Sequence, residues 1–153
     1  MTNAADWLLT TLAENGVEVI FGNPGSTELP VIDALARQDR VRYVLGLQEA
    51  VVVGMADGFA QASGRPAHAN LHTAPGVGNA MGAIFNAQAN HSPVVITAGQ
   101  QARPVITMQA NLTNRDAITV PQPYVKYAYE PTRAEDVPLA LAHAIHLASL
   151  PPM

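Results

Sequence analysis

Short apolar runs alternate along the chain with longer segments whose apolar residues recur at helical spacing. The runs are expected to be strands over 17–21, 41–45, 67–71 and 94–98, the first of them buried. The longer segments are expected to be helices over 3–14, 28–37, 48–62 and 76–90. Strands that alternate with helices in this way form a parallel sheet with helices on both faces. The pattern therefore predicts an α/β fold with a doubly wound, mainly parallel sheet.

The alternation ends near Gly99, and an irregular stretch with several prolines follows. We expect one more strand over 124–129 and a last helix that ends near Ser149. Polar side chains are expected to cap two of the helices: Ser26 or Thr27 for the helix over 28–37, and Thr132 with Glu135, as a capping box, for the last one. There is no internal repeat, and residues 1–153 are expected to form a single domain.

Only 13% of the residues are charged, while 48% are hydrophobic. Because soluble domains usually have about 25% charged residues, this shortage indicates that another domain or chain covers part of the surface. The net charge of −4 and the lack of a Lys/Arg cluster argue against a nucleic-acid partner. With no cysteine in the sequence, we expect no disulfide, thiol nucleophile or Cys-ligated zinc.

The first residues lack the basic start of a secretory signal and soon reach Asp6. The longest apolar run, 50–56, is much shorter than the roughly 20 residues that span a bilayer. We therefore expect a cytoplasmic protein without a membrane partner.

Chemically capable side chains follow the predicted strands in turn. Ser26 follows the first strand, Glu49 the second, His72 the third, and Gln100 with Gln101 the fourth. Parallel strands end at one edge of their sheet, where ligands bind in open α/β folds. Glu49 also begins an apolar segment, where helix amides would hold a poorly solvated carboxylate, as suits a tuned acid. Alone, Glu49 could be a carboxylate near a helix N-terminus and His72 a core histidine; together they indicate a shared site.

Three other patterns give weaker hypotheses. Residues 76–82 have the spacing of a dinucleotide-binding loop, but no acidic residue follows between 81 and 115 to hold a ribose. We interpret them as a helix whose small residues permit close approach. Ser26 is followed by Thr27 and Glu28, where the G-x-S-x-G nucleophile elbow of a hydrolase has its second glycine, so a hydrolytic triad with His72 is disfavoured. His143 and His146 lie three apart without an acidic ligand between them, so we predict no metal site.

Several longer motifs are spread over almost the whole chain. They are FGNPGSTE at 21–28, QEA at 48–50 followed by MADGFA at 55–60, NLH at 70–72, GNAMG at 78–82, HSP at 91–93 and TAGQQ at 97–101. Together they resemble the pyrimidine-binding (PYR) domain of thiamin-diphosphate-dependent 2-keto acid decarboxylases. The pair of Ser26 and His72 resembles the benzoylformate decarboxylase branch of that family.

The resemblance implies thiamin diphosphate as cofactor and a 2-keto acid as substrate. By resemblance, Glu49 is the glutamate that bonds to a ring nitrogen of the aminopyrimidine, and the cofactor carries the difficult step. Ser26 would hold the substrate carboxylate, and His72 would donate a proton. The remaining residues implied by the resemblance are Asn23, Pro24 and Gly25 as a backbone wall beside the cofactor, and Glu28 and Leu112 as possible neighbours of the substrate.

The chain departs from the family in two ways. The benzoylformate branch has two leucines where this sequence has Asn111 and Leu112, beside the expected substrate position. Family members also continue into a middle domain and a pyrophosphate-binding (PP) domain that holds Mg²⁺. Because the sequence ends at Met153, we expect both domains to be absent and the Mg²⁺ to require a missing PP domain.

Three functions remain as hypotheses. The first is the PYR module of a benzoylformate-like decarboxylase that is inactive alone and works with a PP-containing chain or as a homodimer or higher oligomer. The second is a non-catalytic stand-alone remnant or fragment of the fold. The third, which the incomplete motifs above disfavour, is a nucleotide-binding or hydrolase domain.

Overall fold

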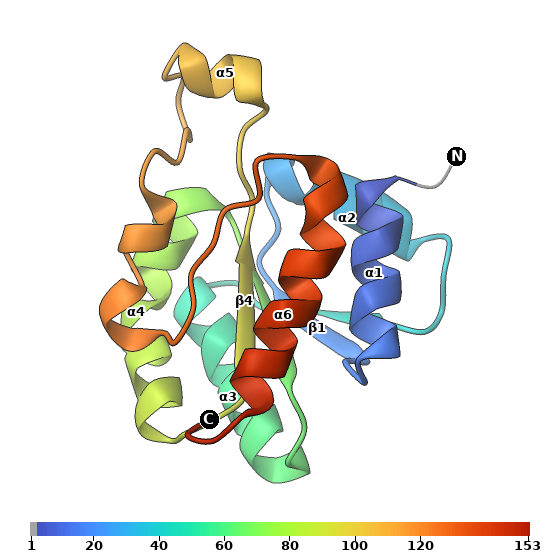
Figure 1. Ribbon diagram of the computed structural model, residues 1–153, viewed down its shortest axis with the longest axis vertical. Coiled ribbons are helices and arrows are strands. Elements are labelled where there is room, and N and C mark those ends of the chain that lie inside the picture. Colours follow the sequence, from blue (N-terminus) through green and yellow to red (C-terminus); the bar gives the residue numbers. More distant parts are fainter. Residues whose placement is uncertain (1–2) are drawn as a thin grey trace.

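Four parallel strands in the order β2–β1–β3–β4 form the centre of the computed structural model, which describes residues 3–153 (Figure 1). The strands are β1 (Val19–Gly22), β2 (Arg42–Leu45), β3 (Ala67–Leu71) and β4 (Val94–Ala98). Every neighbouring pair is parallel, so all four strands end at the same edge of the sheet. The four strands expected from the apolar runs are confirmed.

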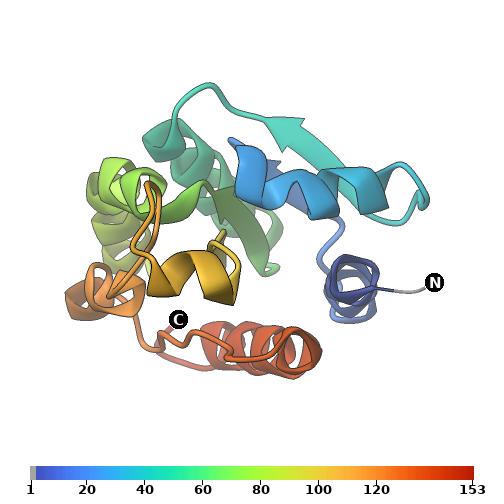
Figure 2. The ribbon, with the colours of Figure 1, turned by 90° about the horizontal axis from the view of Figure 1, so that it is seen from above.

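Helices cover both faces of this sheet. Figure 2 shows α3 and α4 on one side and α1 and α6 on the other. The helices of residues 3–153 are α1 (Ala4–Glu14), α2 (Leu29–Leu35), α3 (Glu49–Ser63), α4 (Thr73–Ala89), α5 (Arg103–Thr107) and α6 (Val137–Ser149), with short 3-10 helices η1 (Ser26–Glu28), η2 (Ala117–Thr119), η3 (Gln122–Tyr124) and η4 (Ala134–Asp136). The predicted doubly wound α/β architecture is therefore confirmed.

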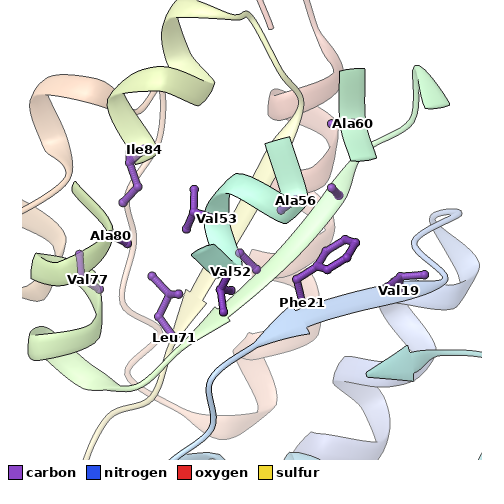
Figure 3. Close-up of a cluster of buried hydrophobic side chains, with 12 residues drawn as sticks. Val19, Phe21, Val52, Val53, Ala56, Ala60, Leu71, Val77, Ala80 and Ile84 are labelled. Atoms are coloured by element: carbon purple, nitrogen blue, oxygen red, sulfur yellow. The ribbon is translucent and has the colours of Figure 1, made fainter. Parts of the chain in front are cut away.

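Alternate residues of the central strands point to opposite faces, and each face is buried. Val19 and Phe21 of β1 pack in a core with Val52 of α3, as Figure 3 shows. Ile20, between them, lies in a second core with Leu12 of α1. A strand buried on both faces can be apolar at every position, which explains why β1 appears as an uninterrupted apolar run in the sequence.

β2 lies at the edge of the sheet and is less well covered. Helix α3 packs on β1 and β3. The side chains of Val44 and Leu45 are exposed, and so are Leu47 and Val51 just after the strand. We call Val44, Leu45, Leu47 and Val51 the β2–α3 surface.

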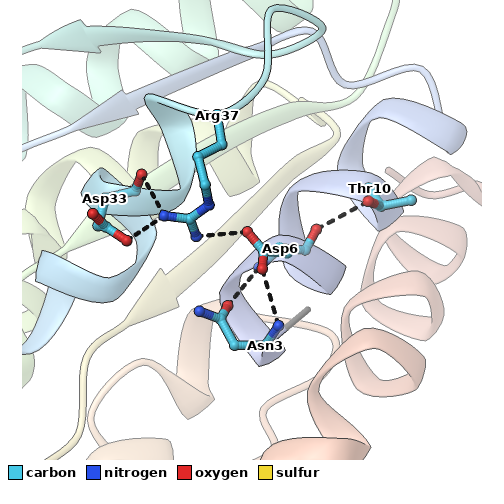
Figure 4. A network of polar contacts seen from close by, with 5 residues as sticks. All are labelled: Asn3, Asp6, Thr10, Asp33 and Arg37. Carbon is cyan, nitrogen blue, oxygen red and sulfur yellow. Dashed lines mark hydrogen bonds and ion pairs between the residues drawn. The ribbon is translucent and has the colours of Figure 1, made fainter. Parts of the chain in front are cut away.

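A polar network joins the start of α1 to the end of α2 (Figure 4). The N–H of Asp6 donates to Asn3 Oδ1 at 3.0 Å, and the N–H of Asn3 donates to Asp6 Oδ2 at 2.9 Å. Arg37, just past α2, donates to Asp6 Oδ1 at 2.7 Å and also pairs with Asp33. These donors, the Asn3 backbone first, hold the pKa of Asp6 below its usual value. The network fastens α1, which begins at Ala4, one residue after the predicted start, to α2.

The expected strand over 124–129 is wrong. Residues 122–124 form η3, and no strand follows before α6. The aromatic side chains of this segment pack on helices instead. Tyr124 lies edge-on to Phe85 of α4, with ring centroids 5.4 Å apart. Tyr127 packs on His143 of α6. The segment thus connects the α4 side of the molecule to the α6 side (Figure 1).

The two predicted caps are also wrong. The last helix follows η4 and begins at Val137 without a side-chain cap, and Glu135 pairs with Arg133 rather than capping. Pro138 lies in its first turn, where a missing N–H costs nothing. Neither Ser26 nor Thr27 caps α2, because both lie within η1. Two further features differ from expectation. Helix α4 begins at Thr73, three residues before the predicted start, and α5 was not predicted.

Lys126 holds the end of α6. Its Nζ donates to the carbonyls of Leu147 at 2.7 Å, Leu150 at 2.7 Å and Pro152 at 2.8 Å. A cation that satisfies free carbonyls at a helix C-terminus also interacts favourably with the helix dipole.

Lys126→Met is expected to lower the free energy of unfolding by about 1 kcal/mol, because the carbonyls lose their charged donor. Urea unfolding of the chain measures the change. Arg133→Met is the control, since Arg133 is an exposed cation that pairs only with a residue two positions away. Equal losses in the two variants would show that the Lys126 contacts add no stability.

Candidate active site

Glu49 is the first residue of α3 and lies almost buried at the carboxyl edge of the sheet, with 8% exposure. Gln48 caps the helix by accepting the Val51 N–H at 3.2 Å. Asn23 Nδ2 donates to Glu49 Oε1 at 3.2 Å, and Asn79 Nδ2 donates to Oε2 at 3.2 Å. Each carboxylate oxygen therefore has one amide donor and can accept another hydrogen bond.

The support of Glu49 differs from the expectation in one respect. Side-chain amides from the β1–η1 segment and from α4 hold the carboxylate, where helix amides were expected. Asn23 was predicted to lie beside the cofactor, whereas Asn79 was not predicted as a site residue. The available signal was that Asn79 is the only amide side chain in a run of glycine, alanine, valine and methionine over 76–83.

Gly76 lies close to this carboxylate. A Cβ at position 76 would lie 3.3 Å from Glu49 Oε1 and 3.4 Å from Leu71 Cβ. The segment 76–82 lies within α4, so its small residues belong to a helix that approaches a neighbour closely. This confirms the helix interpretation over the dinucleotide loop.

A second polar group lies between η1 and the end of β3. Glu28 is 2% exposed. Its Oε2 accepts the Gly25 N–H at 2.8 Å, and its Oε1 accepts the Thr27 hydroxyl at 2.7 Å. His72 Nδ1 lies 2.8 Å from Glu28 Oε2 and 3.1 Å from Thr27 Oγ1. The carboxylate thus lies beneath the His72 ring, whose side chain is 22% exposed.

Two glycines make this packing possible. A Cβ at Gly25 would lie 2.3 Å from His72 Nδ1, and a Cβ at Gly99 would lie 1.9 Å from Glu28 Oε1. Neither distance is possible between real atoms, so both positions require the absence of a side chain. Gly25 and Gly99 therefore bring η1, β3 and the end of β4 into contact around Glu28.

The residue after His72 has a strained backbone. Thr73 has φ +51°, a conformation that β-branched residues rarely adopt. It is fully buried, and its Oγ1 has no hydrogen-bond partner within residues 3–153. Such strain costs on the order of 1–3 kcal/mol and persists only where the surrounding structure imposes it. The backbone of the β3–α4 turn is thus fixed at His72.

The other predicted site residues form no hydrogen bond with Glu49 or His72 in the described part of the chain. Ser26 is exposed on η1, and Pro24 is half-buried before it. Leu112 is half-buried, with φ +65°. Gln100 holds the segment that contains Leu112, since its Nε2 donates to the Asn114 carbonyl at 2.7 Å and its Oε1 accepts the Asn114 N–H at 3.1 Å.

Among residues 3–153, no group of three or more His, Asp or Glu side chains gathers in a way that could hold a metal ion. No helix in that range combines the length and the apolar character needed to cross a membrane.

The arrangement is suited to a ligand that offers a ring nitrogen and an amino group. Glu49 presents a buried acceptor with free lone pairs, and Gly76 packs against it without a side chain. His72 offers a second titratable group from the end of β3, at the same edge of the sheet. The fold and the site thus define a cofactor-binding α/β domain with an acid at the carboxyl edge of its sheet. Residues 2–120 match the family described as thiamine pyrophosphate enzyme, N-terminal TPP binding domain, and the chain belongs to that family.

Relatives of known function agree with this assignment. The benzoylformate decarboxylase of Pseudomonas aeruginosa is 57% identical over 141 residues, which cover 92% of this chain and 26% of that protein. The acetolactate synthase large subunit of Haemophilus influenzae is 31% identical over 147 residues, which cover 96% of this chain and 26% of that protein. The solved structure of the thiamine diphosphate-dependent 4-hydroxybenzoylformate decarboxylase of Rhodococcus jostii RHA1 superposes with a TM-score of 0.94 at 46% identity, covering 99% of this chain and 28% of that one. The chain thus spans about a quarter of the length of these relatives.

Proposed function

We propose that the chain is the PYR module of a thiamin-diphosphate-dependent decarboxylase that acts on a 2-keto acid of the benzoylformate type. The observation that carries this proposal is the position of Glu49, buried at the carboxyl edge with one donor on each oxygen and a glycine packed against it. The family match and the 57% identity to a benzoylformate decarboxylase support the choice of cofactor and substrate class.

The residues present fit the aminopyrimidine of the cofactor. Glu49 would accept a hydrogen bond from a protonated ring nitrogen, while Asn23 and Asn79 hold the carboxylate in place. When bound, thiamin diphosphate supplies a nucleophilic carbon and an electron sink for the loss of CO₂. The backbone of Asn23, Pro24 and Gly25 would form the wall beside it.

The proposed substrate contacts come from Ser26 and His72. The hydroxyl of Ser26 is exposed at the carboxyl edge, where it can donate to a substrate carboxylate. His72 would exchange a proton with the substrate oxygen. Leu112 is the proposed apolar neighbour, held near the end of β4 through Gln100 and Asn114.

The Mg²⁺ and the diphosphate are proposed to be held by another domain or chain. Mg²⁺ prefers several hard oxygen ligands, and no cluster of three or more acidic or histidine side chains gathers within residues 3–153. The decarboxylase reaction then requires this chain together with a PP-containing partner.

Complementation tests this proposal. The chain is mixed with the remaining part of a benzoylformate decarboxylase that contains its PP domain, and CO₂ release from benzoylformate is followed with thiamin diphosphate and Mg²⁺. We expect little activity from either part alone and restored activity from the mixture. A mixture that assembles and binds the cofactor but releases no CO₂ would favour the non-catalytic alternative. Pyruvate, a 2-keto acid without the aromatic ring, is the comparison substrate.

We also propose that the chain self-associates when no such partner is present. The β2–α3 surface is apolar, with Leu47 at 88% exposure. On α4, Gly78 and Gly82 face open space and Phe85 is half-exposed. Apolar surface of this kind is usually covered by a second chain, and a symmetric dimer is the commonest arrangement.

Light scattering of the chain at about 100 μM is expected to give a mass near twice 16.1 kDa or higher. Leu47→Lys should raise the dissociation constant at least about tenfold, since it places a charge in the buried part of the interface. Leu139→Lys is the matched control, because Leu139 is 76% exposed on α6, on the opposite side of the sheet. A monomeric parent, or equal effects of the two variants, would contradict this proposal.

A further inference from the structure

The Glu28 carboxylate makes contacts that determine where the proton of His72 lies. An ionised carboxylate has no proton to donate, so both oxygens only accept. Oε2 faces the Gly25 N–H and His72 Nδ1, and Oε1 faces the Thr27 hydroxyl. Each of these contacts is 2.8 Å or shorter. The carboxylate therefore has three donors if His72 Nδ1 carries a hydrogen, and only two if it does not.

The Thr27 hydroxyl leads to the same assignment. Its single proton is directed to Glu28 Oε1 at 2.7 Å, so Oγ1 can only accept from its other neighbour. That neighbour is His72 Nδ1, at 3.1 Å. Both atoms that face Nδ1 are thus acceptors. If Nδ1 carried no hydrogen, its own lone pair would face the lone pairs of these two oxygens, which is unfavourable.

We infer that Glu28 is a positioning residue that holds His72 as the Nδ1–H tautomer. Nε2 is then the nitrogen that accepts or releases a proton. No residue within 3–153 forms a hydrogen bond with Nε2, whereas Nδ1 is fully engaged. Glu28 acts through His72 and not on the substrate, since its carboxyl group is buried beneath the ring. The catalytic meaning of this arrangement rests on the proposed function, but the tautomer itself does not.

The surroundings of Glu28 allow little alternative geometry. Side chains are excluded at Gly25 and Gly99, whose Cβ positions would overlap the His72 ring and the Glu28 carboxylate. The strained backbone of Thr73 fixes the turn that carries His72. The ring is therefore held by its backbone from one side and by Glu28 from the other. This agrees with a group that must present one chosen nitrogen to a ligand.

Long-range ¹H–¹⁵N correlation spectra of the ¹⁵N-labelled chain read the tautomer directly. His72 is one of five histidines and is assigned by the signal that disappears in His72→Gln. In alkaline buffer, where a free imidazole is neutral, we expect His72 to carry its proton on Nδ1. Glu28→Gln should shift the tautomer ratio about tenfold or more toward Nε2–H, because the charged acceptor is lost. Thr27→Ser, which keeps the hydroxyl, should leave the ratio of the parent.

Circular dichroism confirms that each variant is folded, and Glu14→Gln on α1 is the control for a carboxylate far from the site. An Nε2–H tautomer in the parent overturns the inference, and this spectrum decides the matter even if Glu28→Gln does not fold. A folded Glu28→Gln with the parent's tautomer ratio also overturns it. The spectra need neither cofactor nor PP partner, so a failed complementation experiment leaves this result unchanged.

Discussion

Glu49→Gln is expected to reduce the decarboxylase activity of the assembled enzyme by about 100-fold or more, the usual scale for a lost acid–base group. Glutamine has the shape of glutamate but lacks the negative charge that favours a proton on the pyrimidine nitrogen. It also has one acceptor oxygen where the carboxylate has two, so in the present geometry either Asn23 or Asn79 would face the glutamine NH₂ group in place of an acceptor. The rate of CO₂ release from benzoylformate measures the loss.

The fold should survive this change, because glutamine and glutamate fill the same volume. Thermal unfolding of the isolated variant checks this point. Glu14→Gln is the matched control, since Glu14 lies on the surface of α1 and pairs there with Arg40. Activity of Glu49→Gln within a few-fold of the parent would show that another carboxylate activates the cofactor.

The position of the site could be predicted from the sequence because it depends on the order of the strands alone. Parallel strands share their carboxyl edge, so Glu49 and His72 were placed at one edge once the four apolar runs were identified as strands. No side-chain contact was needed for that step. β1 was clear because it is buried on both faces and has no polar position, whereas β3 contains the buried His68 and Asn70.

The pairing of Glu28 with His72 could not be predicted in this way. The two residues are 44 positions apart, and their contact depends on space left by Gly25 and Gly99. A glycine gives no sign in the sequence of which side chain will fill the space beside it. Sequence reasoning therefore placed Glu28 beside the substrate, whereas the structure places its carboxylate under the His72 ring. The substrate role of Glu28 stays an untested prediction.

The prediction of a strand after β4 failed for a related reason. A run of aromatic residues over 124–129 has the composition of a strand, but composition does not show what the rings will contact. Tyr124 packs on α4 and Tyr127 on α6, so the chain crosses between two helices and forms no ladder. Structure that depends on such tertiary contacts lies beyond local patterns.

A buried polar chain crosses the sheet beneath the site and includes His68, which is 1% exposed. His68 Nε2 lies 3.0 Å from Thr97 Oγ1, which accepts from Asn70 Nδ2 at 3.1 Å, and Tyr43 donates to Asn70 Oδ1 at 3.2 Å. His68 Nδ1 has no hydrogen-bond partner within residues 3–153. Burial lowers the pKa of His68 to about 4, from 6.5 for a free side chain.

This lowered pKa makes the stability of the fold depend on pH. The folded state holds His68 neutral, while the unfolded chain takes up a proton below about pH 6.5. The stabilisation is complete above that pH and is lost as the pH falls toward the folded pKa of about 4. Lowering the pH from about 7.5 to 4.5 should therefore reduce the free energy of unfolding by about 2.5 kcal/mol through His68. His68→Gln should remove this contribution to the pH dependence. Urea unfolding of the parent and of His68→Gln across this range measures the difference between them. Taking this difference cancels the contribution of the carboxylates that the two proteins share.

His91→Asn is the control: His91 is exposed with φ +53°, a backbone conformation that asparagine tolerates, so this variant should keep the parent's slope. Parallel curves for the parent and His68→Gln would mean that the polar chain accommodates a charged His68, and that its hydrogen bonds rearrange on protonation.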